Sequence, residues 1–255
     1  SSSTQSQESS SLARSCRDVS RPAPAFERRY LAAREKEGWV YDDAALARLP
    51  HASRDDPHRQ LWQIRARTAT RFADYVAGSG ARSVLELGCG NDWFSHLIAA
   101  RGSAEVVGVD INETELCQAA RVFDAPNLQF AYADIFTARL DRTFDCIVLN
   151  GVVQYFADPA ALWRQLDGLL APGGEIHVLD SPVYASAEEA SAARQRSERY
   201  FANLGEPEMA VSYHHHDWTD FPGFQRQRGG VRRLARRLLR RPTSPFPWLV
   251  RVRAD

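Results

Sequence analysis

An apolar strand followed directly by a glycine turn and a helix start constrains the fold of this chain more than any other segment. Residues 83–95 have the sequence SVLELGCGNDWFS, with one acid, Glu86, inside the predicted strand. Gly88 and Gly90 lack the β-carbons that would keep a ligand away from the backbone, and the helix expected near Asn91 offers free N–H groups. This arrangement is typical of the nucleotide-binding end of an α/β sheet.

The details of the turn argue against a dinucleotide. The dinucleotide-binding fingerprint G-x-G-x-x-G requires a third small residue, and Trp93 occupies that position. Glu86 also disfavours a diphosphate, because a carboxylate just before the turn repels phosphate and attracts an ammonium group. The turn alone is modest support, since many such turns only connect a strand to a helix.

Three further predicted strands each end in a polar side chain. Asp110 ends the first and is placed to accept hydrogen bonds from two ribose hydroxyls. Asp134 ends the second, where its carboxylate suits an adenine amino group while Ile135 packs on the ring. Asn150 ends the third, and ligands bind at the carboxyl ends of strands in open α/β sheets. The three strands are expected at 104–111, 128–134 and 144–150.

Together these motifs resemble those of the class I S-adenosylmethionine-dependent methyltransferases. The resemblance covers roughly residues 60–255 and rests on five motifs in the family's order: Glu86-Leu87-Gly88-Cys89-Gly90, Asp110, Asp134-Ile135, Asn150 and Leu169-Leu170-Ala171-Pro172-Gly173-Gly174. It implies an α/β fold, a doubly wound seven-stranded mostly parallel sheet of the Rossmann-like methyltransferase type, with S-adenosyl-L-methionine as cofactor. One departure is Asp92, where many relatives have glycine or another small residue.

The resemblance also implies which residues hold the cofactor. Glu86 and the glycine turn would hold the methionine moiety, and the region of Asn150 its ammonium group. Asp110 would bind the ribose, and Asp134 and Ile135 the adenine. The full expected set is Glu86, Gly88, Cys89, Gly90, Asp110, Ile111, Asp134, Ile135 and Asn150.

The chain is expected to divide into three parts. Residues 1–20 are serine-rich and predict a disordered tail, because they cannot bury enough apolar surface to fold. Residues 21–78 are too aromatic for a linker and show helical periodicity over 61–76, which predicts an N-terminal helical cap. This cap either covers the cofactor pocket, as in relatives, or packs against the sheet edge. Residues 79–255 would form the methyltransferase core, with substrate-side elements at 181–245.

Later segments predict the rest of the sheet and its helices. An apolar helical face that precedes Pro172-Gly173-Gly174 predicts a helix ending at these three residues, followed by a strand at 175–180. A further helix is expected from about 186 to 204. The family topology implies an antiparallel last strand at 247–252, paired with 224–228.

Substrate selection is expected after Asp180, where the sequence becomes specific to this chain. His214, His215 and His216 are adjacent and point in different directions, which argues against a metal site. One of them, with His215 as our candidate, is expected to be a general base, and Tyr155 and Asp180 are other candidates. The alternative is a polar loop without catalytic function. An amine or carbon acceptor needs only positioning and a hydroxyl needs a base, so the acceptor atom stays open.

The carboxyl-terminal segment is strongly basic. Residues 225–255 contain ten arginines and one acid, so this segment carries a charge of +9 and residues 1–224 carry −9. Residues 231–241 predict an amphipathic helix. Its arginines could bind a phosphate-bearing substrate, nucleic acid or an anionic membrane. We favour the alternative that its apolar face packs on the sheet while the arginines pair with the acidic remainder.

Several other classes of protein are disfavoured by the composition. No apolar run is long enough to span a membrane and no signal-peptide core is present at the amino terminus, so we expect a cytoplasmic protein. The four cysteines lack C-x-x-C spacing, which gives no support for zinc.

We therefore expect an enzyme that transfers a methyl group to oxygen or nitrogen of a small-molecule acceptor, such as a metabolite, sugar or natural product. One alternative is a non-catalytic S-adenosylmethionine-binding protein. Another is a methyltransferase that acts on RNA or a phosphorylated carrier through the arginine helix.

Overall fold

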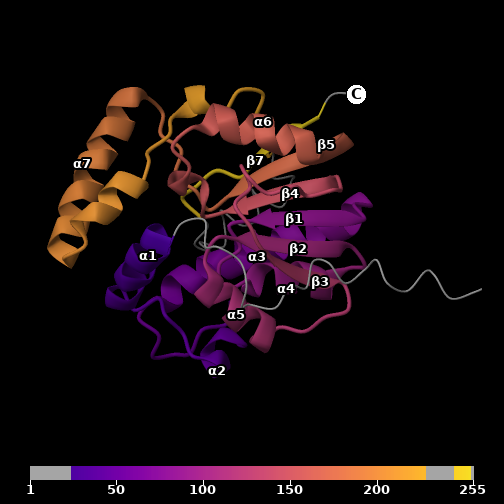
Figure 1. Ribbon diagram of the computed structural model, residues 1–255, viewed down its shortest axis with the longest axis horizontal. Coiled ribbons are helices and arrows are strands. Elements are labelled where there is room, and N and C mark those ends of the chain that lie inside the picture. The colour runs from indigo at the N-terminus through magenta and orange to yellow at the C-terminus, as the bar shows by residue number, and fades with distance from the viewer. Residues whose placement is uncertain (1–23, 228–243, 254–255) are drawn as a thin grey trace, which may run out of the picture.

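The computed structural model describes residues 24–227 and 244–253, which fold around one mixed sheet (Figure 1). Its strands are β1 (Ser83–Leu87), β2 (Glu105–Asp110), β3 (Leu128–Tyr132), β4 (Phe144–Asn150), β5 (Leu170–Leu179), β6 (Gln225–Arg226) and β7 (Leu249–Val252). Their order in the sheet is β3-β2-β1-β4-β5-β7-β6. The first five strands are parallel, whereas β7 runs antiparallel to β5 and β6. The expected doubly wound, seven-stranded, mostly parallel sheet is confirmed, including its antiparallel last strand.

Helices connect the parallel strands and begin at capping residues. Asn112, Asp158 and Ser186 each occupy an N-cap and accept a hydrogen bond from the backbone N–H three residues later. The α-helices are α1 (Pro24–Lys36), α2 (Asp43–Leu46), α3 (Arg59–Ser79), α4 (Trp93–Arg101), α5 (Glu113–Val122), α6 (Pro159–Leu169) and α7 (Ala187–Leu204). Three 3₁₀ turns are η1 (Val153–Tyr155), η2 (Pro207–Ser212) and η3 (Trp218–Asp220). The helix expected from about 186 to 204 is thus confirmed as α7.

Successive strand side chains face two different apolar layers. Val84 of β1 belongs to the layer completed by Phe72 of α3 and Phe94 of α4. Leu85, one position later, belongs to the layer completed by Leu162 of α6. Burying one such side chain contributes about 1.5–3 kcal/mol. The sheet is therefore covered on both faces, which holds the carboxyl ends of its strands in fixed positions.

The boundary between α6 and β5 differs from the prediction. The helix ends at Leu169 and β5 begins at once with Leu170, so the prediction that the helix ends at Pro172-Gly173-Gly174 was wrong. Phe144 pairs with Leu170, but Cys146 pairs with Glu175, so the Pro-Gly-Gly residues form an irregularity inside the strand. The early start of β5 is explained by burial. Leu170 and Phe144 are both fully buried, so their pairing begins the strand before the turn residues are reached.

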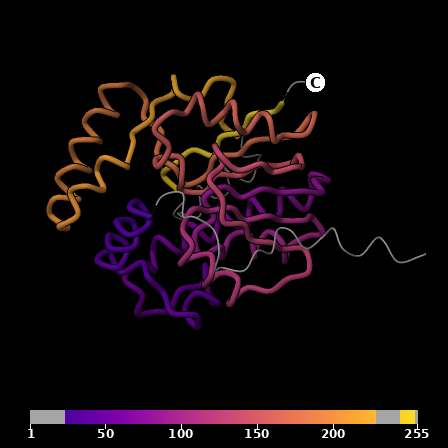
Figure 2. Tube along the Cα trace, in the orientation of Figure 1, coloured from indigo at the N-terminus to yellow at the C-terminus, as the bar shows by residue number. Residues whose placement is uncertain are grey.

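The amino-terminal helices form a cap that contacts elements far along the chain. Figure 2 shows α1 beside α7, and α1 meets α7 and η2 through the buried side chains of Ala33, Phe201 and Met209. Ion pairs add to this contact, with Lys36 on Glu206 at 2.5 Å and Arg29 on Glu208 at 2.9 Å. The boundary between cap and core at residue 78 stays a prediction.

Two predicted segments lie outside the described residues, namely the tail at 1–20 and the arginine helix at 231–241. Within the part of the chain that the structure describes, no helix combines the length and the apolar character that crossing a membrane requires.

Candidate functional site

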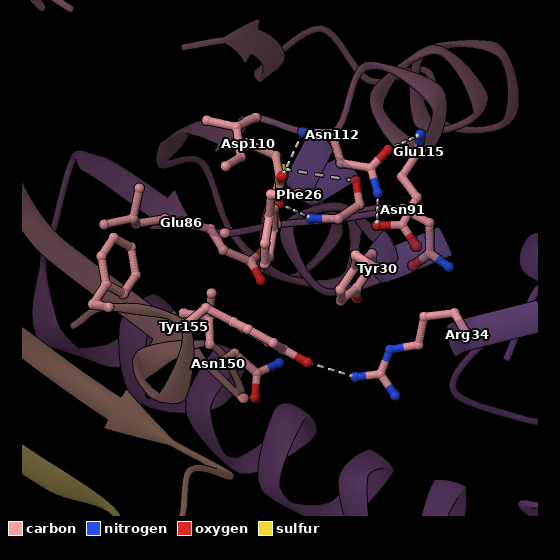
Figure 3. Close-up of a pocket in the computed structure, with 18 of the residues that line it drawn as sticks. Phe26, Tyr30, Arg34, Glu86, Asn91, Asp110, Asn112, Glu115, Asn150 and Tyr155 are labelled. Carbon is pink, nitrogen blue, oxygen red and sulfur yellow. Dashed lines mark hydrogen bonds between the residues drawn. The ribbon is translucent and has the colours of Figure 1, made fainter. Parts of the chain in front are cut away.

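A cavity of about 550 Å³ lies where the carboxyl ends of the parallel strands meet the amino-terminal cap (Figure 3). All nine residues expected to hold a cofactor line it. Tyr155 and Asp180, two of the three catalytic candidates, line it as well. His215 is not among the lining residues, and its neighbour His214 is. The sheet thus brings the predicted site together from separate strands, apart from His215.

The glycines of the turn are required by backbone geometry and by close packing. Gly88 has a φ of 74° and Gly90 a φ of 56°, in the left-handed region that favours glycine. A β-carbon on Gly88 would lie 2.2 Å from Val152 Cγ2, and one on Gly90 would lie 3.0 Å from Glu115 Oε2. Any residue with a β-carbon would therefore clash with neighbouring side chains of the cavity wall at both positions.

Asp110 is held by the turn and keeps part of its hydrogen-bonding capacity. Its Oδ2 accepts from the N–H of Gly90 and its Oδ1 from the N–H of Asn112, both at 2.8 Å. Burial raises the pKa of this carboxyl, and the two N–H groups oppose the rise. A carboxylate offers about four lone-pair sites, so each oxygen can accept one more bond. Asp110 therefore fits a ligand with two neighbouring hydroxyls.

Glu86 and Asp92 form a buried carboxyl pair beneath the turn. Burial and mutual repulsion hold the pKa of Glu86 well above its usual range, which favours a shared proton. Ser95 joins the two, since its hydroxyl donates to Glu86 Oε2 at 2.6 Å and its N–H to Asp92 Oδ1 at 3.2 Å. Asp92 is the N-cap of α4 and does not line the cavity. The aspartate at position 92, where many relatives have a small residue, therefore does not fill the cavity.

The segment after β3 offers a polar edge beside an apolar surface. Asp134 Oδ1 accepts from the N–H of Phe136 at 2.9 Å, and its other oxygen accepts no hydrogen bond among the described residues. Ile135 is buried next to it and also lines the cavity. A carboxylate oxygen next to an aliphatic side chain fits a flat ring that carries an amino group.

Arg65 of α3 was missed by the sequence analysis. Its guanidinium lies over the rings of Trp39 and Trp62, at 4.9 and 5.2 Å from their centres, and lines the cavity. Burial lowers the pKa of this guanidinium, and the nearby Asp180 opposes the shift. It forms no ion pair within the described residues, so it offers donors to an anionic ligand group. The sequence signal that could have identified Arg65 is its position three residues after Trp62, which places a charged side chain on the apolar face of the helix.

A second arginine connects the cap to the end of β4. Figure 3 shows Arg34 of α1 donating to the Tyr155 hydroxyl, at 3.0 Å. Glu37 neutralises Arg34 at 2.9 Å and also accepts from the hydroxyl of Tyr200 on α7, at 2.6 Å. Burial raises the pKa of the Tyr155 phenol, which therefore keeps its proton. These contacts close the cavity on the side of α1 and α7.

The three histidines have three different environments. His215 contacts Ser197 Oγ through Nε2 at 2.9 Å, and burial lowers its pKa to about 4. His216 Nδ1 lies 3.4 Å from Asp220. His214 donates its backbone N–H to the carbonyl of Gln154 at 2.6 Å and is one of the residues that line the cavity. Among residues 24–227 and 244–253, no group of three or more His, Cys, Asp and Glu side chains is arranged to hold a metal ion.

Asp180 stands at the carboxyl end of β5 in a strained conformation. Its φ of 44° is uncommon for a residue other than glycine, although aspartate tolerates it better than most. Its Oδ1 accepts from the hydroxyl of Ser244 at 2.7 Å. Burial raises its pKa, and Ser244 and Arg65 oppose the rise. The side chain is therefore fixed at the cavity wall.

Comparison with known proteins gives one family and a consistent set of relatives. The family described as "Methyltransferase domain" matches residues 79–229. A trans-aconitate 2-methyltransferase from Methylobacterium radiotolerans is 36% identical over 152 residues, which are 57% of this chain and 56% of the relative. A ubiquinone biosynthesis O-methyltransferase from Stutzerimonas stutzeri is 26% identical over 127 residues, 48% of this chain and 54% of the relative. The chain thus spans about half the length of the curated relatives it matches.

Among solved structures, the plantazolicin methyltransferase BpumL, in complex with a triazolic desmethylPZN analog and SAH, has the same fold with a TM-score of 0.52. The match covers 90% of this chain and 97% of that chain at 16% identity. The likeness therefore extends over the amino-terminal cap as well as the sheet.

Proposed function

Because the chain belongs to the family described as "Methyltransferase domain", we propose that it transfers a methyl group from S-adenosylmethionine to a small-molecule acceptor. The family match confirms the resemblance found in the sequence. The observation that carries the proposal is the convergence of all nine expected cofactor-binding residues on one cavity.

Each part of S-adenosylmethionine has a chemically matching group in this cavity. Asp110 would accept from the two ribose hydroxyls, and Asp134 with Ile135 would hold the adenine. Arg65 would bind the methionine carboxylate, because it is a half-buried cation at the cavity wall without an ion pair among the described residues. The ammonium group would lie near Asn150 and the buried Glu86.

When bound, S-adenosylmethionine supplies a methyl group on positively charged sulfur, which is already activated for transfer. The protein then has to align the acceptor and exclude water, and alignment alone contributes about 7–11 kcal/mol in favourable cases. The cap residues Tyr30 and Arg34 line the cavity and contact Tyr155 there. Of the three catalytic candidates, Tyr155 and Asp180 line the cavity and His215 does not, and a catalytic role for each of the three stays a prediction.

A small molecule is favoured as acceptor by the enclosed cavity and by the names of the relatives, which refer to trans-aconitate and to ubiquinone biosynthesis. The arginine segment that would carry RNA lies outside the described residues, and no other observation favours that alternative.

The proposal is tested by supplying the protein with S-adenosylmethionine and separated fractions of a cell extract, one of small molecules and one of RNA. We expect S-adenosylhomocysteine to form with the small-molecule fraction. Binding of S-adenosylmethionine without turnover in any fraction would favour the non-catalytic alternative, and turnover only with RNA would contradict a small acceptor.

A further inference from the structure

The cavity extends beyond the residues that would hold the cofactor. Those residues follow β1, β2 and β3, together with Asn150 at the end of β4. The lining residues that follow β4, β5 and α7 form the remaining part, which we call the acceptor end. Its side chains include those of Tyr155, Asp180, Val211, Ser212 and His214.

The charges at the acceptor end favour a cation. Asp180 is the carboxylate there. Its Oδ1 accepts from the hydroxyl of Ser244, and the side chain of Thr68 also hydrogen-bonds to it. Arg34 is neutralised by Glu37 at 2.9 Å. Arg65 lies near Asp180 without forming an ion pair and is assigned to the cofactor carboxylate by the proposed function. The acceptor end therefore offers one carboxylate and no cation that an anionic acceptor could use.

Aromatic rings that line the same cavity also suit a positively charged acceptor. Phe26 and Tyr30 of α1 pack against Tyr155, with ring centres 5.8 and 5.6 Å apart and planes at steep angles. All three rings line the cavity. Faces of aromatic rings attract ammonium groups, and they also contact the apolar body that carries such a group.

His214 supplies a proton acceptor in the wall of the same cavity. Its side chain makes no hydrogen bond among the described residues, while its backbone N–H donates to the carbonyl of Gln154. Burial lowers its pKa, and the charged groups that act on it, His216 and Arg194, lower it further. The imidazole is therefore neutral near pH 7 and can accept a proton.

We propose that the methyl acceptor is a primary or secondary amine, which binds as an ammonium ion to Asp180 and gives one proton to His214. This inference rests on the proposed function. The nitrogen lone pair freed by the proton forms the new bond to the methyl carbon. The bond from that carbon to sulfur breaks and leaves its electron pair on sulfur, so the positive charge passes to nitrogen. The methylated ammonium stays opposite Asp180, and the proton on His214 leaves to water.

The charge preference is tested by calorimetric titration of protein saturated with S-adenosylhomocysteine. The probes are two matched series, tyramine, tyrosol and 4-hydroxyphenylacetate, and hexylamine, hexanol and hexanoate. We expect an amine to bind at least tenfold more tightly than its alcohol and acid. Asp180→Asn should remove this preference, whereas Asp141→Asn, at an exposed position outside the cavity, should retain it. Equal or tighter binding of the alcohols or acids, or no binding of either amine, would overturn the proposal.

The role of His214 is tested with His214→Gln and the amine that binds most tightly. Methyl transfer should fall at least tenfold at pH 7 and recover as the pH rises toward the pKa of the amine, because more amine then arrives without its proton. A loss that is the same at every pH would assign His214 a structural role and contradict its part in the proposal.

Thermal stabilisation by S-adenosylmethionine separates this inference from the proposed function. It should persist in Asp180→Asn and His214→Gln, since neither residue is assigned to the cofactor. Wild-type protein that S-adenosylmethionine does not stabilise would contradict the proposed function itself. Wild-type protein that is stabilised but has no preference for amines would overturn only the inference about the acceptor.

Discussion

Replacing Arg65 with methionine should weaken cofactor binding through one identifiable group, the methionine carboxylate. The substitution keeps most of the side-chain length against Trp39 and Trp62 but removes the charge and all five donors. Arg67→Met is the matched control, because Arg67 lies on the same helix with an exposed side chain and does not line the cavity.

The magnitude follows from the environment of the guanidinium. It is half-buried, lies on two indole rings and forms no ion pair within the described residues, so a ligand carboxylate would be its first hydrogen-bonded charged partner. Hydrogen bonds to charged groups contribute about 1.5–3 kcal/mol each. A bidentate contact with imperfect additivity then gives about 3 kcal/mol, which corresponds to a roughly 150-fold change in Kd.

The assay compares two ligands by calorimetry, S-adenosylhomocysteine and 5′-S-(3-aminopropyl)-5′-thioadenosine, which lacks only the carboxylate. Wild-type protein and Arg67→Met should prefer S-adenosylhomocysteine by about two orders of magnitude. Arg65→Met should bind the two ligands with similar affinity. If Arg65→Met keeps the full preference, the carboxylate is bound elsewhere and the reasoning from the unpaired guanidinium fails.

Three further predictions concern the turn and the buried acids. Asp110→Ala should abolish thermal stabilisation by S-adenosylmethionine, and unchanged stabilisation would refute the cofactor assignment. Gly88→Ala should lower the free energy of unfolding in urea by about 2–4 kcal/mol, because its φ is 74° and its β-carbon would lie 2.2 Å from Val152; a loss below 0.5 kcal/mol would show that the turn adapts. Glu115 has a pKa raised to about 8 by burial and then by Asp110, so folding binds a proton and stability falls as pH rises from 4.5 to about 8. Glu115→Gln should reduce that slope in urea unfolding, and an unchanged slope would contradict the raised pKa.

The cofactor side of the site was predictable because its signals are local. Each expected residue lies at or just after the carboxyl end of a strand. Glu86, Asp110 and Asp134 follow one another along the chain because they belong to the ends of β1, β2 and β3. Arg65 belongs to a helix that precedes the glycine turn, so nothing near the motifs identifies it. Only the packing of α3 on the sheet brings it to the cavity.

The histidine run shows what a sequence pattern leaves open. The choice between His214 and His215 depends on the direction of one residue in an irregular loop. That direction is fixed by contacts with distant segments, the hydrogen bond from His214 to Gln154 and the bridge between Tyr184 and Asp217. The boundary at Leu170 was missed for a similar reason, because its burial against Phe144 outweighs the turn propensity of the residues that follow.

The position of Asp92 has a consequence for how sequences of this type can diverge. A β-carbon on Gly108 of β2 would lie 2.2 Å from Asp92 Oδ2, so the aspartate is compatible only with glycine at position 108. Where position 92 is itself glycine, that clash is absent, and the remaining close neighbour of a β-carbon at position 108 is Cys89 Sγ, at 3.0 Å. The two positions should therefore covary among homologues. A lineage that starts with Asp92 and Gly108 has to replace the aspartate with glycine before position 108 gains a side chain. If position 108 changed first, both side chains would occupy the same space.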